Sequence, residues 1–96
     1  MLFKVEMDVN VPAGFDAERF ETLKAAEKAR FQDLQRAGTW RHIRRVVGHY
    51  SNVSIFDVGS NAELHDILTT LPLYPFMAVR VTALCRHPSS IHDDDR

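Results

Sequence analysis

The chain has 96 residues, of which 45% are hydrophobic and 26% charged, and its formal net charge is −1 at pH 7. A single domain of this size buries only about two-thirds of the surface that its unfolded chain exposes, so association with other copies would stabilise it. The near-neutral charge argues against nucleic acid or a membrane surface as a partner. No apolar run approaches the ~18 residues of a membrane span, and no signal-peptide pattern opens the sequence. We therefore expect a cytoplasmic enzyme or binding domain.

Residues 3 to 11 alternate between apolar and polar side chains, which predicts a half-buried strand. Pro12 and Gly14 end this strand, and Asp16 then offers an N-cap oxygen for a helix. We expect that helix to run to about Arg36, because the glycine two residues later is a stop signal.

Glu27 breaks the pattern of this predicted helix. It lies in the middle of a narrow apolar stripe, which is formed by Phe20, Leu23, Phe31 and Leu34. A carboxylate at such a position is costly unless a nearby group pairs with it or its pKa rises. An active-site base has this property. The simpler alternative is that a small rotation of the helix lets Glu27 reach solvent.

The middle of the chain predicts a β-hairpin. Strands are expected at residues 40–47 and 50–58, joined by a turn or bulge at Gly48 and His49. Neither face of the strand at 50–58 is plainly polar. We therefore expect helices on one side of the sheet and a partner chain on the other.

The end of the chain predicts a second helix and a last strand. Ser60 and Glu63 match a capping box, in which each satisfies a backbone donor of the other, and the helix they open ends before Pro72. A strand at 78–85 follows, with the lone Cys85 expected to be reduced and buried in it. The order βαββαβ predicts an α+β, ferredoxin-like fold, with a four-stranded antiparallel sheet and two helices on one face.

Several polar side chains gather at the predicted strand ends and in the polar tail, but few chemistries fit them. No nucleophile elbow surrounds the tail serines, and no histidine or cysteine spacing indicates a metal site. Arg44 and Arg45 are expected to be solvated strand charges. What remains is one carboxylate among cationic groups, which suits proton transfer on an anionic substrate.

Several short motifs, in this order and spacing, make the chain resemble the muconolactone isomerase family. The resemblance covers essentially the whole chain. Each motif is weak by itself, but their combination is specific. The motifs are Leu23–Lys28, Gly38–His42, Gly48–Tyr50, Phe56–Val58, Leu71–Pro75 and Cys85–His92.

This resemblance implies the conversion of (+)-muconolactone into 3-oxoadipate enol-lactone, in the catechol branch of the bacterial β-ketoadipate pathway. It also implies that the enzyme uses no cofactor or metal. The resemblance implies a single domain over residues 1–96 and a decamer with pockets between its subunits. The C-terminal tail at 85–96 is expected to help close these pockets. Three alternatives stay open: a chloromuconolactone dehalogenase, a non-catalytic ferredoxin-like ligand-binding domain and, more distantly, a cofactor-free oxygenase. The dehalogenase is understood to lack the glutamate that this chain keeps.

The residue that matches the family's proposed general base is Glu27. We expect it to move a proton between two ring carbons, with Tyr50 and Asn52 as donors either to the charge that develops on the lactone oxygen or to the substrate carboxylate. The remaining candidates are expected to bind substrate; they are Lys24, Arg41, Arg86, His87 and Ser89.

Overall fold

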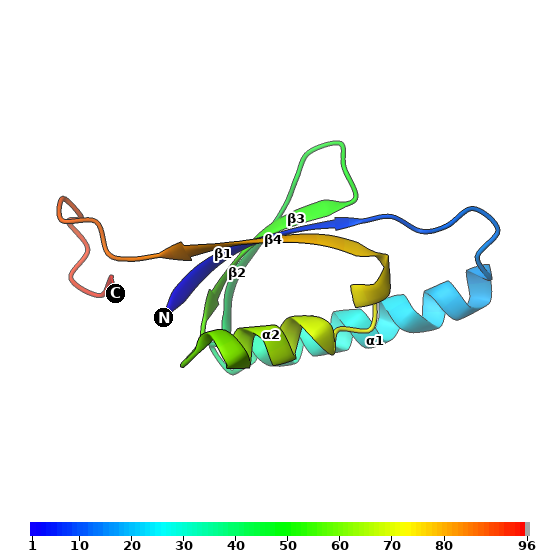
Figure 1. Ribbon diagram of the computed structural model, residues 1–96, viewed down its shortest axis with the longest axis horizontal. Helices are drawn as coiled ribbons and strands as arrows, with labels where there is room; N and C mark the ends of the chain where they lie inside the picture. The colour runs from blue at the N-terminus through cyan, green and yellow to red at the C-terminus, as the bar shows by residue number, and fades with distance from the viewer. Residues whose placement is uncertain (96) are drawn as a thin grey trace.

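The computed structural model describes residues 1–95, and its element order is the predicted βαββαβ. The four strands form one antiparallel sheet in the order β2-β3-β1-β4, and both helices lie on the same face of it (Figure 1). This arrangement confirms the ferredoxin-like fold. The elements are β1 (Leu2–Val9), α1 (Ala17–Arg36), β2 (Trp40–Arg45), β3 (Ser51–Asp57), α2 (Asn61–Thr69), the 3₁₀ turn η1 (Tyr74–Phe76) and β4 (Met77–Leu84).

The strands β1 and β4 differ from the prediction at their ends. β1 ends at Val9, which pairs with Met77, the first residue of β4, so Val11 lies exposed beyond the strand that was expected to include it. At the other end of β4, Cys85 follows the last strand residue and is exposed, so its predicted burial is wrong. The reason is that β4 is an edge strand whose far end runs beyond the helices (Figure 1).

The N-terminal caps of the two helices form largely as predicted. The Asp16 side chain accepts hydrogen bonds from the first turn of α1, and Ser60 Oγ accepts one from the N–H of Glu63 at 3.1 Å. The Glu63 carboxylate, however, accepts from the N–H of Gly59 at 2.6 Å instead of from Ser60. Each cap still satisfies backbone donors that a helix start leaves open.

A bulge between Trp40 and His42 explains why β2 shows no clean alternation. After the bulge, Ile43 and Arg45 face the helices together with Trp40, because they pair with the helix-facing residues of β3. The strand's helix side therefore changes from a buried indole at one end to a guanidinium at the other.

The hydrophobic core fills the space between the sheet and the helices. Its centre is Trp40, whose ring lies 4.5 Å from that of Phe56 and 4.1 Å from that of Phe31, measured between centroids. The other buried apolar residues come from β1, the end of β3, α2 and the segment after it, and are Phe3, Val5, Met7, Val58, Leu64, Ile67, Leu68, Leu71 and Leu73.

The opposite face of the sheet carries no helix (Figure 1). It is mixed in character, with an ion pair from Arg80 to Glu6 at 2.7 Å beside the half-buried Val53 and Ile55. The partner chain expected on this face stays a prediction. Within residues 1–95, no helix combines the length and apolar character that a membrane crossing requires.

Candidate active site

Glu27 is the one buried residue of α1, with 4% of its surface exposed. The apolar stripe around it is only half-buried: Phe31 and Leu34 pack against the core on one side, while Phe20 lies edge-on to Phe15 on the other. The structure therefore confirms the predicted burial of Glu27 and excludes the alternative in which the helix turns this side chain to solvent.

The two oxygens of the Glu27 carboxyl group have different surroundings. Oε2 accepts a hydrogen bond of 2.6 Å from the backbone N–H of Leu73, in the segment between α2 and β4. Oε1 is buried and has no hydrogen-bond partner among residues 1–95. Burial raises the pKa of Glu27 above its ordinary value, and the hydrogen bond from Leu73 opposes part of that rise. A carboxylate of this kind is a stronger base than one in water.

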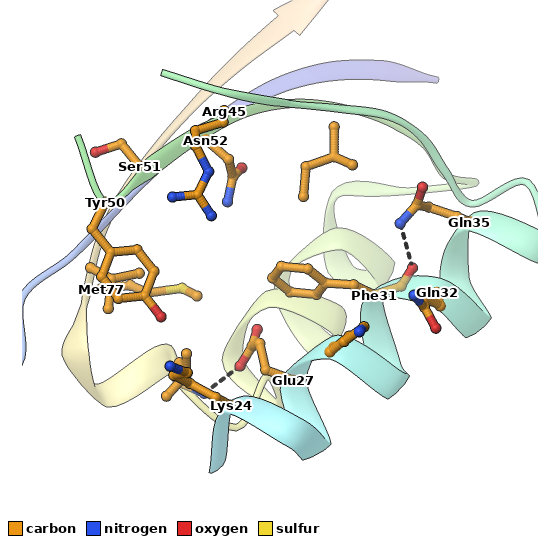
Figure 2. Close-up of a pocket in the computed structure, with 14 residues that line it drawn as sticks. Lys24, Glu27, Phe31, Gln32, Gln35, Arg45, Tyr50, Ser51, Asn52 and Met77 are labelled. Carbon is orange, nitrogen blue, oxygen red and sulfur yellow. Dashed lines mark hydrogen bonds between the residues drawn. The ribbon is translucent and has the colours of Figure 1, made fainter. Parts of the chain in front are cut away.

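A cavity of about 420 Å³ opens beside Glu27, between α1 and the ends of the strands. Figure 2 shows the carboxyl group pointing from α1 into this space, with Tyr50, Arg45 and Asn52 pointing in from the sheet side. The lining residues come from α1, from all four strands and from the segments just before β3 and η1, and include Lys24, Lys28, Phe31, Ile43, Ser51 and Met77.

Four of the residues predicted from the sequence meet at this cavity: Glu27, Lys24, Tyr50 and Asn52. Their chemical roles stay predictions. The structure does explain their convergence, because α1 crosses the sheet beside the hairpin ends that carry Tyr50 and Asn52 (Figure 2).

The other four predicted residues do not line this cavity. Arg41 lies at the bulge of β2, and Arg86, His87 and Ser89 belong to the tail. The tail leaves the sheet at the end of β4 opposite η1 (Figure 1) and forms its own hydrogen bonds. Arg86 donates to the carbonyl oxygens of Ser90 and His92, and the Ser89 N–H donates to Nδ1 of His87. Within a single chain, the structure therefore does not bring these four residues to the cavity.

The amide of Asn52 is held from two sides. Its Oδ1 accepts a 2.7 Å hydrogen bond from the buried hydroxyl of Ser54, and its Nδ2 lies 3.6 Å from the sulfur of Met7. The second N–H of Nδ2 makes no hydrogen bond within residues 1–95 and can donate to a molecule in the cavity.

The sequence alone missed three groups of the site. Arg45 is exposed, as expected of a solvated strand charge, but it also lines the cavity, as does Lys28. Neither makes a hydrogen bond or ion pair within the described part of the chain, whereas Lys24 pairs with Glu21 at 3.1 Å. The third is the Leu73 N–H, which as a backbone group leaves no signal in the sequence. The basic cluster at 41–45 was the one available sign of Arg45.

The charges at the cavity are unequal: three cationic side chains, Lys24, Lys28 and Arg45, surround a single carboxylate. An anionic molecule of modest size therefore fits the cavity electrostatically. No group of three His, Cys, Asp or Glu side chains among residues 1–95 is arranged to hold a metal ion.

Comparison with known proteins agrees with this geometry. A family model described as Muconolactone delta-isomerase matches residues 1–90. Muconolactone Delta-isomerase 2 of Acinetobacter lwoffii is 62% identical over 96 residues, all of both chains. Muconolactone Delta-isomerase of Pseudomonas aeruginosa is 55% identical over the same length, again all of both chains. A crystal structure of muconolactone isomerase superposes with a TM-score of 0.94 at 56% identity, covering all of each chain. The chain belongs to the muconolactone Delta-isomerase family.

Proposed function

We propose that this chain isomerises (+)-muconolactone to 3-oxoadipate enol-lactone by proton transfer without a cofactor, in the cytoplasm, as a step of catechol breakdown. The observation that carries the proposal is the buried Glu27, whose unpartnered Oε1 faces a cavity with excess positive charge. A buried carboxylate with a raised pKa suits the removal of a weakly acidic carbon-bound proton. Membership of the family supports the choice of substrate.

The reaction moves one proton between two ring carbons. Glu27 removes the proton from the carbon that bears the carboxymethyl arm, and the electron pair passes through the conjugated ring onto the lactone oxygen. Glu27 then returns the proton to the carbon next to the carbonyl. In preorganised sites a single donor to such an oxyanion is worth about 3 kcal/mol. We assign this role to Asn52 Nδ2 and the Tyr50 hydroxyl, two of the donors that line the cavity.

The carboxylate arm of the substrate needs a cationic partner. Lys24 was predicted to bind substrate and lines the cavity, but Glu21 already neutralises part of its charge. Lys28 and Arg45 have no such partner in the part of the chain described, so we assign them the larger share of carboxylate binding. Arginine holds a carboxylate with two parallel hydrogen bonds, which also fixes the orientation of the arm.

We propose that the tail at 85–96 closes the cavity of another subunit, in a homo-oligomer that is a decamer. Arg96 lies outside the described residues. β4 has eight residues and therefore carries the chain about 25 Å from the cavity edge at Met77 to the start of the tail. From there the tail runs on away from the cavity (Figure 1), so we infer that Arg86, His87 and Ser89 reach substrate across a subunit boundary. Arg41, outside the cavity of its own chain, would act in the same way.

Removal of residues 86–96 tests this assignment of the tail. We expect the truncated chain to keep a folded Glu27 site but to bind lactone at least tenfold more weakly, because its neighbours' cavities are open to water. Light scattering on the full-length protein tests the assembly, and a monomer with full activity would contradict both statements.

An absorbance assay of muconolactone consumption, with chloride release from a chlorinated muconolactone measured in parallel, tests the function itself. We expect rapid isomerisation of muconolactone by the wild-type protein. Chloride release as the main activity would instead identify a dehalogenase, and binding of muconolactone without turnover would identify a ligand-binding domain. Either outcome would overturn the proposal.

A further inference from the structure

The segment between α2 and β4 contacts the base directly, although none of its side chains was predicted to take part in chemistry. The backbone N–H of Leu73 donates to Glu27 Oε2 at 2.6 Å, and the Leu73 side chain is itself buried. This N–H is fixed by the turns on either side of it: Tyr74 N–H donates to Leu71 O, and Phe76 N–H donates to Leu73 O, each at 2.9 Å.

We propose that the Leu73 N–H is a positioning group for the base, holding Oε2 so that Oε1 alone carries the proton in both halves of the reaction. This inference rests on the proposed isomerase function and deepens it. Leu73 acts through Glu27 and contacts no reacting atom, so it is not a catalytic residue. Its contribution is the orientation of the carboxyl group and the difference between its two oxygens.

The proton is accounted for at each step when Oε1 carries it and Oε2 stays bonded to Leu73. Oε1 of the ionised carboxylate forms an O–H bond with the ring proton, while the electron pair of the broken C–H bond moves into the conjugated lactone. The O–H bond then breaks, its proton forms the new C–H bond next to the carbonyl, and the carboxylate is regenerated. Oε2 keeps its hydrogen bond to Leu73 throughout. The carboxyl group therefore need not rotate between the two steps.

Burial is the main cause of the raised pKa of Glu27, and the same contact limits that rise. A donor to Oε2 favours the ionised form and so opposes the effect of burial on the pKa of Glu27. The other titratable groups that line the cavity are Lys24 and Lys28 on α1, Arg45 on β2 and Tyr50 before β3. None of them hydrogen-bonds to Glu27 within residues 1–95, so the Leu73 N–H is the direct contact that an experiment can remove.

Replacing the Leu73 amide with an ester tests the proposal. Incorporation of the α-hydroxy analogue of leucine keeps the side chain and removes only the N–H. The same replacement at Phe76 is the matched control, because it removes a hydrogen bond of the same turn that does not involve Glu27. We expect the acid limb of kcat/KM for the Leu73 ester to move to higher pH by about one pH unit. We also expect kcat on the plateau to fall about tenfold, with KM little changed. The Phe76 ester should keep the wild-type limb.

An NMR titration keeps the proposal testable if the ester variant does not fold, and does not depend on turnover. In wild-type protein the Leu73 amide resonance should move with pH together with the ¹³C-labelled Glu27 carboxyl signal. In Glu27→Gln that pH dependence should disappear. A Leu73 amide that does not titrate, or an ester whose acid limb matches the Phe76 control, would overturn the proposal. If instead the proposed isomerase function is wrong, the wild-type protein will not turn over muconolactone, but the Leu73 amide and the Glu27 carboxyl group will still titrate together.

Discussion

The two helices cover the same face of the sheet but bury different kinds of side chain. α2 has nine residues and buries Leu64, Ile67 and Leu68, whereas α1 has 20 residues and buries only Glu27. The short helix therefore completes the hydrophobic core, and the long helix forms one wall of a cavity. The sheet beneath shows the same change along β2, from the buried Trp40 to Arg45 at the cavity. Stability and chemistry are thus separated along one helix–sheet interface.

Leucine-to-alanine substitutions at matched positions should reveal this separation most strongly. Leu68→Ala removes a buried side chain of α2 and should lower the free energy of unfolding by about 2–5 kcal/mol. Leu23→Ala, at a half-buried position of α1, should cost about 1 kcal/mol. Urea denaturation measures both. Equal costs at the two sites would show that α1 contributes to the core as much as α2 does.

Charge removal at the cavity should affect substrate binding more than stability. Arg45→Gln should raise KM about tenfold, which corresponds to ~1.4 kcal/mol, since it removes a charged partner of the substrate carboxylate. Arg44→Gln is the matched control, because Arg44 is exposed and pairs with Val53 on the other face of the sheet. Steady-state kinetics of both variants decide the assignment. A rise in KM for Arg44→Gln equal to that for Arg45→Gln would place the carboxylate elsewhere.

The buried carboxylate should also make stability depend on pH in a predictable direction. Burial raises the pKa of Glu27 in the folded protein above its value in the unfolded chain. The unfolded chain therefore loses this proton first as pH rises, and stability falls between the two pKa values and then stays lower. At a pH below the pKa that Glu27 has in the unfolded chain, Glu27 is neutral in both states and does not lower the stability.

Glu27→Gln removes this titration, so its stability relative to wild type should improve as pH rises through that window and then stay constant. Each tenfold difference in proton affinity between the two states is worth about 1.4 kcal/mol. Thermal unfolding from pH 4 to pH 8 measures the difference. A stability difference that is independent of pH would show that burial of the carboxylate carries no such cost.

The sequence predicted those features that depend on periodicity. Alternation of apolar and polar residues correctly predicted β1. The apolar stripe of α1 correctly placed Glu27 at the buried face of that helix. The sequence did not predict that Arg45 lines the cavity. The bulge between Trp40 and His42 changes which residues of β2 face the helices, and a bulge leaves no clear pattern in a sequence. The role of the Leu73 N–H was equally inaccessible, since every residue except proline carries that donor.

The tail shows a different limit of sequence-based prediction. Its motif of Arg86, His87 and Ser89 helped to identify the family, but a motif does not say which subunit's cavity it serves. The tail's position at the far end of the edge strand β4 separates it from Glu27 of the same chain (Figure 1), which supports the proposal that it serves another subunit's cavity.

The most direct test of this account is the turnover of muconolactone by Glu27→Gln, compared with Glu18→Gln as a matched control. Glu18 is an exposed carboxylate in the first turn of the same helix and does not line the cavity, so its replacement makes the same chemical change away from the site. We expect Glu27→Gln to remain folded and to lose about 10³-fold or more in kcat, the range typical of a general base, while Glu18→Gln keeps nearly normal activity. A folded Glu27→Gln protein that turns over substrate within tenfold of wild type would contradict the account.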